Sequence, residues 1–134
     1  MAPGPPAVSL GAAGRAHALA RLFAITRIAV GATLVLAPSV TSSWAGPPAR
    51  RPGIQLITRA AGIRDLVVGW RTVQALDRRA PVRRLLVDGA VADAVDLGAT
   101  VAAWSHLPRL ARLGLLGSGA SAVALGTWLA STLD

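Results

Sequence analysis

The sequence predicts an all-α integral membrane protein, a four-helix bundle with up-down-up-down topology. More than half of the 134 residues are apolar (53%) and only 15% are charged, whereas about a quarter of a soluble domain is usually charged. The apolar residues form four blocks of about 20 residues, the length that a helix needs to cross roughly 30 Å of hydrocarbon. Proline residues and polar runs separate the blocks, which places loops between the helices.

Residues 15–134 are expected to form a single domain. Its helices are predicted to end near Pro38, Pro81 and Pro108, and alanine and leucine dominate without a persistent alternation of period 2, which argues against strands. Residues 1–14, rich in proline, glycine and alanine, predict a flexible N-terminal tail. The four predicted spans cover about residues 17–37, 54–76, 85–105 and 111–131.

Two alternatives to four spans remain open. A soluble bundle would need a broad polar face on each helix, and the stretch 113–133 contains no charged residue. A cleaved signal peptide would end near Ala45, but its segment is too long and Arg27 interrupts its apolar region. The sequence therefore favours a multi-pass protein of the cell membrane.

Arginine supplies the positive charge of the chain, because there is no lysine, and the formal net charge is +8. In short loops, an excess of arginine marks the cytoplasmic side. The six arginines predicted on the side of the termini outnumber the four opposite, so both termini are expected to be cytoplasmic. The six are Arg15, Arg21, Arg78, Arg79, Arg83 and Arg84, and the four are Arg50, Arg51, Arg109 and Arg112.

Several classes of function are excluded by composition. The absence of cysteine excludes disulfides and thiolate sites, and two histidines cannot build a histidine-rich metal site. One phenylalanine and no tyrosine leave no aromatic platform for nucleic-acid bases. The chain is thus expected to bind the lipid bilayer, with no metal, cofactor or nucleic acid.

Charged residues lie at the centres of three of the predicted spans. A charge at mid-bilayer costs about 2.5 to 3.5 kcal/mol, so these groups are expected to face one another inside the bundle. Asp93 and Asp96, three residues apart, share one helix face. We expect Arg64 to pair with Asp93 or Asp96, and Arg27 to close the cluster. Asp65 follows Arg64 directly and points about 100° away from it.

Intramembrane charge suggests a functional site by default. The first hypothesis is a site that binds or transforms a lipophilic small molecule, for example by epoxide opening or isomerisation. Aspartate would act as the general acid or base and arginine would stabilise negative charge. The candidate catalytic residues are Asp93, Asp96, Asp65, Arg64 and Arg27, and the candidate substrate-binding residues are Arg59, Asp88 and Trp70.

Other roles for the same cluster stay open. Buried charges can serve only to fix helix packing, which would suit a structural or accessory subunit of a larger membrane complex, or a homo-oligomer. A proton or ion relay is a third hypothesis, for which no polar path to either surface is evident. Small residues in the fourth span, Gly114 with Ser118 and Gly117 with Ser121, predict close approach of a neighbouring helix, as do Gly62, Gly69, Gly89 and Gly98.

One sequence pattern carries a family resemblance. Residues 59–65 have the form R-x-x-G-x-R-D, the third span contains D-x-x-D at 93–96, and the first span contains Arg27. Over about residues 17–131 the chain resembles a family of small actinobacterial membrane proteins with a DUF4267-like domain of unknown function. The resemblance implies four membrane helices and no particular activity.

Overall fold

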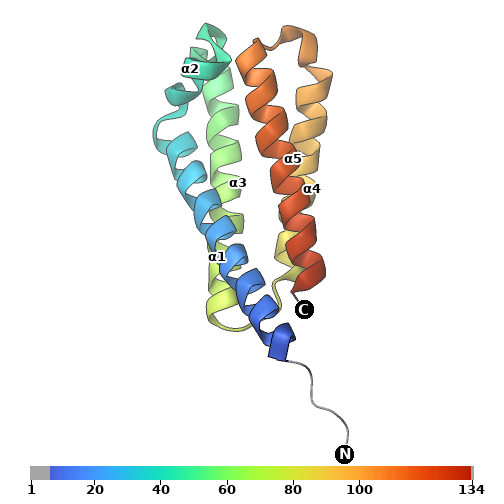
Figure 1. The fold of residues 1–134 in the computed structure, drawn as a ribbon. Helices are drawn as coiled ribbons and strands as arrows, with labels where there is room; N and C mark the ends of the chain where they lie inside the picture. Colours follow the sequence, from blue (N-terminus) through green and yellow to red (C-terminus); the bar gives the residue numbers. More distant parts are fainter. Residues whose placement is uncertain (1–6, 134) are drawn as a thin grey trace, which may run out of the picture.

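The computed structural model describes residues 7–133, and the chain is all-helical over that range. Four long helices form the body of the molecule, and short helical turns connect them (Figure 1). The prediction of an all-α fold with four long helices is confirmed. The long helices are α1 (Ala7–Leu36), α3 (Pro52–Asp77), α4 (Arg83–Ala102) and α5 (Arg109–Thr132); the turns are η1 (Pro38–Thr41), α2 (Ser42–Ala45), η2 (Pro47–Arg50) and η3 (Trp104–His106).

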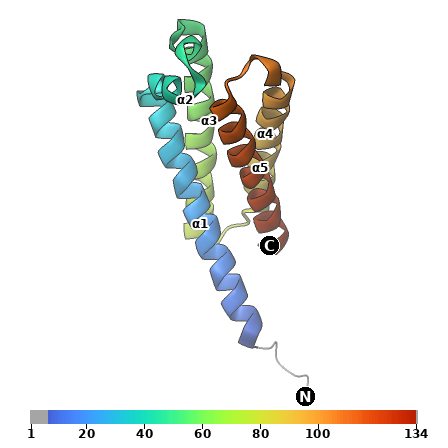
Figure 2. The same cartoon turned by 45° about the horizontal axis from the view of Figure 1, so that its top comes forward.

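Helix boundaries differ from the predicted ones at two places. Helix α1 begins at Ala7, inside the stretch 1–14 for which a tail was predicted; residues 1–6 lie outside the described range. Alanine is the strongest helix former and no proline lies between Ala7 and Pro38, so the helix extends toward the N-terminus. Its first turns project beyond the bundle (Figure 2). Helix α4 ends at Ala102, three residues earlier than predicted, and passes into η3.

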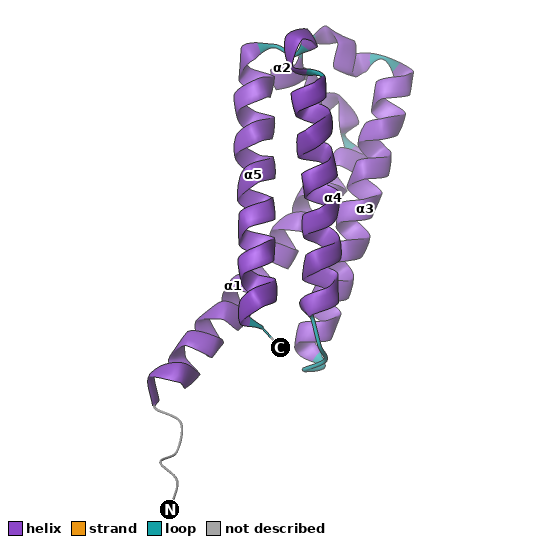
Figure 3. Ribbon diagram, turned by 90° about the vertical axis from the view of Figure 1, so that its right-hand side faces the viewer, coloured by secondary structure: helices purple, strands orange, loops and turns teal. Residues whose placement is uncertain are grey.

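The bundle consists of two tightly packed helix pairs. Helix α1 packs mainly against α3, and α4 packs mainly against α5, while contacts between the pairs are sparse. Consecutive long helices run in opposite directions, and the start of α1 and the end of α5 lie at the same end of the bundle (Figures 1 and 3). Helices α3 and α4 are antiparallel as predicted, but α3 packs most closely against α1, and α4 against α5.

Glycine allows α1 and α3 to approach closely. A Cβ atom on Gly62 would lie 2.7 Å from the carbonyl oxygen of Gly31, and one on Gly31 would lie 2.5 Å from the carbonyl oxygen of Gly62. Further along the same contact, a Cβ on Gly69 would lie 2.7 Å from the carbonyl oxygen of Ala24. Because these obstacles are backbone atoms, no side-chain rearrangement could make room. The predicted packing roles of Gly62 and Gly69 are confirmed.

The glycines of α5 that pack are not those predicted. A Cβ on Gly119 would lie 3.3 Å from the side chain of Leu97 on α4, and one on Gly126 would lie 3.4 Å from Cβ of Ala90. The predicted small-residue pairs of α5 instead lie on its outer side, so the expectation of close packing there is wrong within this chain. Nothing lies within 4 Å of a Cβ placed on Gly114 or Gly117, and Ser118 and Ser121 are exposed. The same open space is found at Gly98 of α4, so its expected packing role is also wrong within this chain.

An apolar core joins the two pairs at one end of the bundle. It lies where α3 passes into α4, at the same end as the start of α1 and the end of α5. Leu76, Leu86 and Leu129, contributed by three different helices, are at most 3% exposed. Toward the middle of the bundle, the contacts between pairs become polar. The charged residues therefore hold the pairs together at a level where apolar packing does not.

A turn with an unusual arginine connects α3 to α4. Arg79 has φ = 52°, a left-handed conformation in which glycine is usual. The amide N–H of Ala80 donates to the carbonyl of Ala75 (2.9 Å) and that of Arg79 donates to Leu76 (3.2 Å), the bonding pattern of a Schellman cap. The short turn sets the end of α3 beside the start of α4.

Replacing Arg79 with glycine is expected to stabilise the fold by about 0.5 to 1 kcal/mol, because glycine removes the strain of a left-handed side-chain-bearing residue. The measurement is thermal unfolding in detergent micelles, followed by circular dichroism. Arg78, which precedes it and has φ = −86°, is the matched control: Arg78→Gly is expected to destabilise. Equal effects of the two substitutions would contradict the assignment of strain to Arg79.

Candidate functional site

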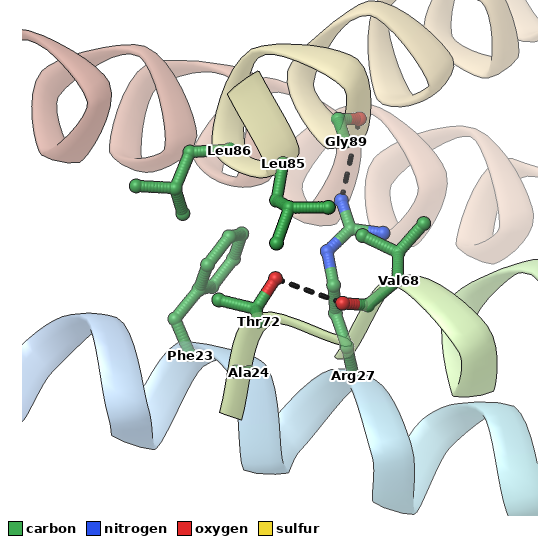
Figure 4. Close-up of a pocket in the computed structure, with 8 residues that line it drawn as sticks. All are labelled: Phe23, Ala24, Arg27, Val68, Thr72, Leu85, Leu86 and Gly89. Atoms are coloured by element: carbon green, nitrogen blue, oxygen red, sulfur yellow. Dashed lines mark hydrogen bonds between the residues drawn. The ribbon is translucent and has the colours of Figure 1, made fainter. Parts of the chain in front are cut away.

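Arg27 is the centre of the charged network. It projects from α1 and is 7% exposed. Its Nη1 donates to Oδ1 of Asp65 on α3 at 2.8 Å, and its Nη2 donates to Oδ2 of Asp93 on α4. The same Nη2 also reaches the backbone carbonyl of Gly89 at 3.5 Å (Figure 4). One guanidinium group thus bonds to carboxylates from both helix pairs.

Neighbouring residues hold the guanidinium in place. Phe23, one turn earlier on α1, places its ring 5.3 Å from the guanidinium carbon, a cation–π distance. Gly89 has no side chain, so the guanidinium lies against the α4 backbone; a Cβ there would be 3.6 Å from Nη2. Val68 of α3 lies on the other side of Arg27 (Figure 4). These contacts fix the direction in which Arg27 crosses between the pairs.

Arg64 forms a second, more exposed part of the network. Its Nη2 donates to Oδ2 of Asp96 at 2.7 Å and to Oδ1 of Asp65 at 3.3 Å. The side chain of Arg64 is 32% exposed and that of Asp96 is 54% exposed. Nε of Arg64 is buried and has no hydrogen-bond partner within the described part of the chain. The network therefore runs from a buried centre at Arg27 to an open edge between α3 and α4.

The predicted cluster is present, with a different arrangement from the expected one. The ion pair between Arg64 and Asp96 is confirmed. Arg27, expected only to close the cluster, is its centre and takes both Asp65 and Asp93. Adjacent Arg64 and Asp65, expected to point about 100° apart, form an ion pair in which Nη2 of Arg64 lies 3.3 Å from Oδ1 of Asp65. The five candidate catalytic residues thus form one connected network.

The three predicted substrate-binding residues lie apart from this network. Trp70 is 58% exposed and Asp88 is exposed. Arg59 is also exposed, and its Nε donates to the carbonyl of Val35 at 3.3 Å. No described contact links any of them to Arg27 or Arg64, and their substrate-binding role stays a prediction.

A small cavity lies beside Arg27, between the helix pairs. Its volume is about 10 Å³, and its lining includes Phe23, Val68, Thr72 and Leu86 (Figure 4). A space of this size holds about one water molecule. The hydroxyl of Thr72 donates to the carbonyl of Val68 at 2.8 Å, so it is already bonded to its own helix. Water fits beside the network, whereas an organic substrate would need the helices to move.

A larger hollow of about 270 Å³ opens at the end of the bundle, where α3 turns into α4. His17 and Arg79 line it together with Leu76 and Leu133, and it shares no residue with the charged network. Among the described residues, no three histidine, cysteine, aspartate or glutamate side chains form a group that could hold a metal ion. The network is therefore an arrangement of guanidinium and carboxylate groups.

Sequence reasoning missed two participants, Phe23 and Gly89. Phe23 is the only phenylalanine of the chain and lies four residues before Arg27, a spacing that places both on one helix face. That spacing was a usable signal. Gly89 is predicted only as a packing residue, and nothing in the sequence indicates that its carbonyl accepts a hydrogen bond from another helix.

Comparisons with known proteins add no relative. No protein-family model, no curated protein and no solved structure matches the chain. The resemblance to the DUF4267-like family stays a prediction, and the functional argument depends on the geometry described above.

Proposed function

We propose that the chain is a multi-pass membrane protein with a structural or accessory role, in which the charged network fixes two helix pairs against each other at mid-bilayer. The observation that carries the proposal is the position of Arg27, a buried guanidinium bonded to Asp65 of one pair and Asp93 of the other. A buried ionic group of this kind sets register and partner choice better than it adds stability.

Two helices support the membrane location directly. The segments Gly11–Leu36 and Arg109–Thr132 are long and apolar enough to cross a membrane, and only 22% and 17% of their most apolar windows are buried. The core helix of a soluble protein buries its apolar residues, whereas these helices turn theirs outward. Outward-facing apolar surface on this scale matches hydrocarbon as the surrounding solvent.

Helices α3 and α4 are less apolar, and by composition alone they are not among the helices apolar enough to cross a membrane. Their lengths of 26 and 20 residues correspond to about 39 and 30 Å, enough for the hydrocarbon core. Asp65 and Asp93 lie near the midpoints of these helices and point inward, whereas Arg59, Arg71 and Asp88 are exposed charges on the same helices. Their outer surfaces also carry large apolar side chains, with Ile63, Val67 and Val95 at least half exposed.

A structural role accounts for the site better than catalysis does. Acid–base chemistry at Asp93 requires space for a substrate beside the carboxylate, and the cavity beside Arg27 has room for about one water molecule. Both carboxylates that Arg27 contacts are engaged in ion pairs. The binding or conversion of a lipophilic small molecule is therefore the second candidate.

Single cysteines would test the membrane topology, since the chain contains none. Ala80→Cys reports on the α3–α4 turn, and Ser105→Cys reports on the opposite end of the bundle; both positions are exposed. With cytoplasmic termini, a membrane-impermeant maleimide is expected to label Ser105→Cys in intact cells, and Ala80→Cys only after permeabilisation. The protein is also expected to resist extraction from membranes by alkaline carbonate.

Two results would contradict the proposal. Labelling of both cysteines from the same side would show that α4 does not cross the membrane. Release of the protein by carbonate would show that no helix is inserted. Labelling of Ala80→Cys alone in intact cells would reverse the orientation and leave the multi-pass structure in place.

A further inference from the structure

The charged network contains more negative than positive charge. Two guanidinium groups, those of Arg27 and Arg64, face three carboxylates, those of Asp65, Asp93 and Asp96. Arg27 is shared between two carboxylates, and the described ion pairs of all three carboxylates involve these two guanidinium groups. With all three carboxylates ionised, the network lacks one positive charge, and an uncompensated charge in a bilayer costs about 2.5 to 3.5 kcal/mol.

The excess negative charge of the network is exposed at the edge between α3 and α4. There the carboxylate of Asp96 is 54% exposed, although Arg64 occupies its Oδ2. Its other oxygen has no hydrogen bond described for it. Asp96 lies about one turn past the buried Asp93 and six residues before the end of α4 at Ala102, which places the exposed carboxylate about 9 Å inside the helix. Lipid tails cannot solvate such a group.

On the basis of the proposed membrane function, we propose that this edge binds a transmembrane helix of another protein that carries an arginine or lysine at mid-depth. The partner's cation would pair with the free oxygen of Asp96 and complete the charge balance of the network. Polar and charged side chains are known to associate helices in lipid, where water cannot satisfy them. The proposed accessory role would then have a partner of defined chemistry, a cationic transmembrane helix.

Charge and shape favour a partner helix with a cation over a second copy of this chain and over a small molecule. A second copy of the chain would bring the same negative excess to the interface, and like charges repel in low dielectric. A small lipophilic amine would need a concave site, and neither cavity described above is lined by Arg64 or Asp96. Ala92 and Ala99 lie one turn on either side of Asp96, and such small residues leave room for a helix to approach.

The test uses the full chain reconstituted in liposomes and labelled through Ala80→Cys. The probes are synthetic transmembrane peptides of leucine and alanine with arginine, glutamine or leucine at the centre. Förster transfer between protein and peptide measures association. The arginine peptide is expected to associate about tenfold more strongly than the leucine peptide, with glutamine between them.

Two variants locate the contact. Asp96→Asn is expected to reduce association of the arginine peptide to that of the leucine peptide. Asp88→Asn, which removes an exposed carboxylate from the same helix, is expected to leave it unchanged. Circular dichroism of both variants establishes that they fold. If Asp96→Asn does not fold, the comparison of the arginine, glutamine and leucine peptides on the unaltered protein still tests the inference.

Equal association of the arginine and leucine peptides would overturn the inference, as would undiminished association with Asp96→Asn. Transfer between two differently labelled copies of the chain that the arginine peptide fails to displace would overturn it in favour of self-association. Cysteine labelling separates these failures from failure of the proposed function. If the chain spans the bilayer and shows no preference for arginine, only the partner assignment fails.

Discussion

Replacement of Arg27 with methionine is expected to destabilise the protein by about 3 to 5 kcal/mol. The substitution keeps a long apolar stem but leaves the carboxylates of Asp65 and Asp93 buried without their cation, and an uncompensated buried charge has a cost of this size. Because Arg27 bonds to both helix pairs, the pairs are expected to separate before either unfolds. Thermal unfolding in micelles, combined with a distance measurement between labels on α1 and α5, checks both expectations.

The matched control is Arg21→Met on the same helix. Arg21 pairs with Asp77, but both side chains are about half exposed, so the loss of that pair is expected to cost at most about 1 kcal/mol. Adding Asp65→Asn and Asp93→Asn to the Arg27→Met protein is expected to recover most of the lost stability, since no buried charge then lacks a partner. An Arg27→Met protein as stable as the Arg21→Met protein would refute the central role of Arg27.

Substitution of Gly62 by valine is expected to separate α1 from α3, at a cost of about 3 kcal/mol or more. The first side-chain carbon would lie 2.7 Å from the carbonyl oxygen of Gly31 and 2.9 Å from Cβ of Leu34, so the helix axes must move apart. That movement would also withdraw Asp65, one turn away on α3, from Arg27. Thermal unfolding in micelles measures the loss of stability.

Gly114→Val provides the control for this prediction, because nothing lies within 4 Å of the corresponding position on α5. It adds the same side chain to an open surface of α5 and is expected to change stability by less than about 0.5 kcal/mol. If both variants lost stability equally, the close contact of α1 with α3 would not be the cause. A large loss confined to Gly114→Val would indicate that the outer face of α5 is covered in the assembled protein.

The sequence was sufficient to predict the helices and the presence of the charged network. Apolar blocks of span length leave few alternatives to helices, and ionisable groups at equal depth have to meet one another. The short α3–α4 connection then predicted that Arg64 pairs with Asp93 or Asp96, and the structure pairs it with Asp96. These predictions depend on length and depth along each helix, which can be counted directly from residue numbers.

The rotation of each helix about its own axis could not be predicted from residue numbers. In lipid, inward and outward faces are both apolar, so hydrophobic periodicity gives little information about which face is inside. That is why the packing glycines of α5 proved to be Gly119 and Gly126 rather than Gly114 and Gly117. The central position of Arg27 was hidden for the same reason, because it depends on the contact of α1 with α3 at Gly31 and Gly62.

Division of the bundle into two helix pairs has a consequence for biosynthesis. Helices α1 and α3 are synthesised first and contribute Arg27, Arg64 and Asp65 to the network, an excess of one cation. Helices α4 and α5 follow and contribute Asp93 and Asp96 to the network, with no cation. Within the proposed membrane, docking of the two helix pairs lowers the imbalance among these charges without removing it, because two guanidinium groups then face three carboxylates. A chain halted after α3 would hold two of the network's guanidinium groups and one of its carboxylates, so one guanidinium would wait for the carboxylates of α4.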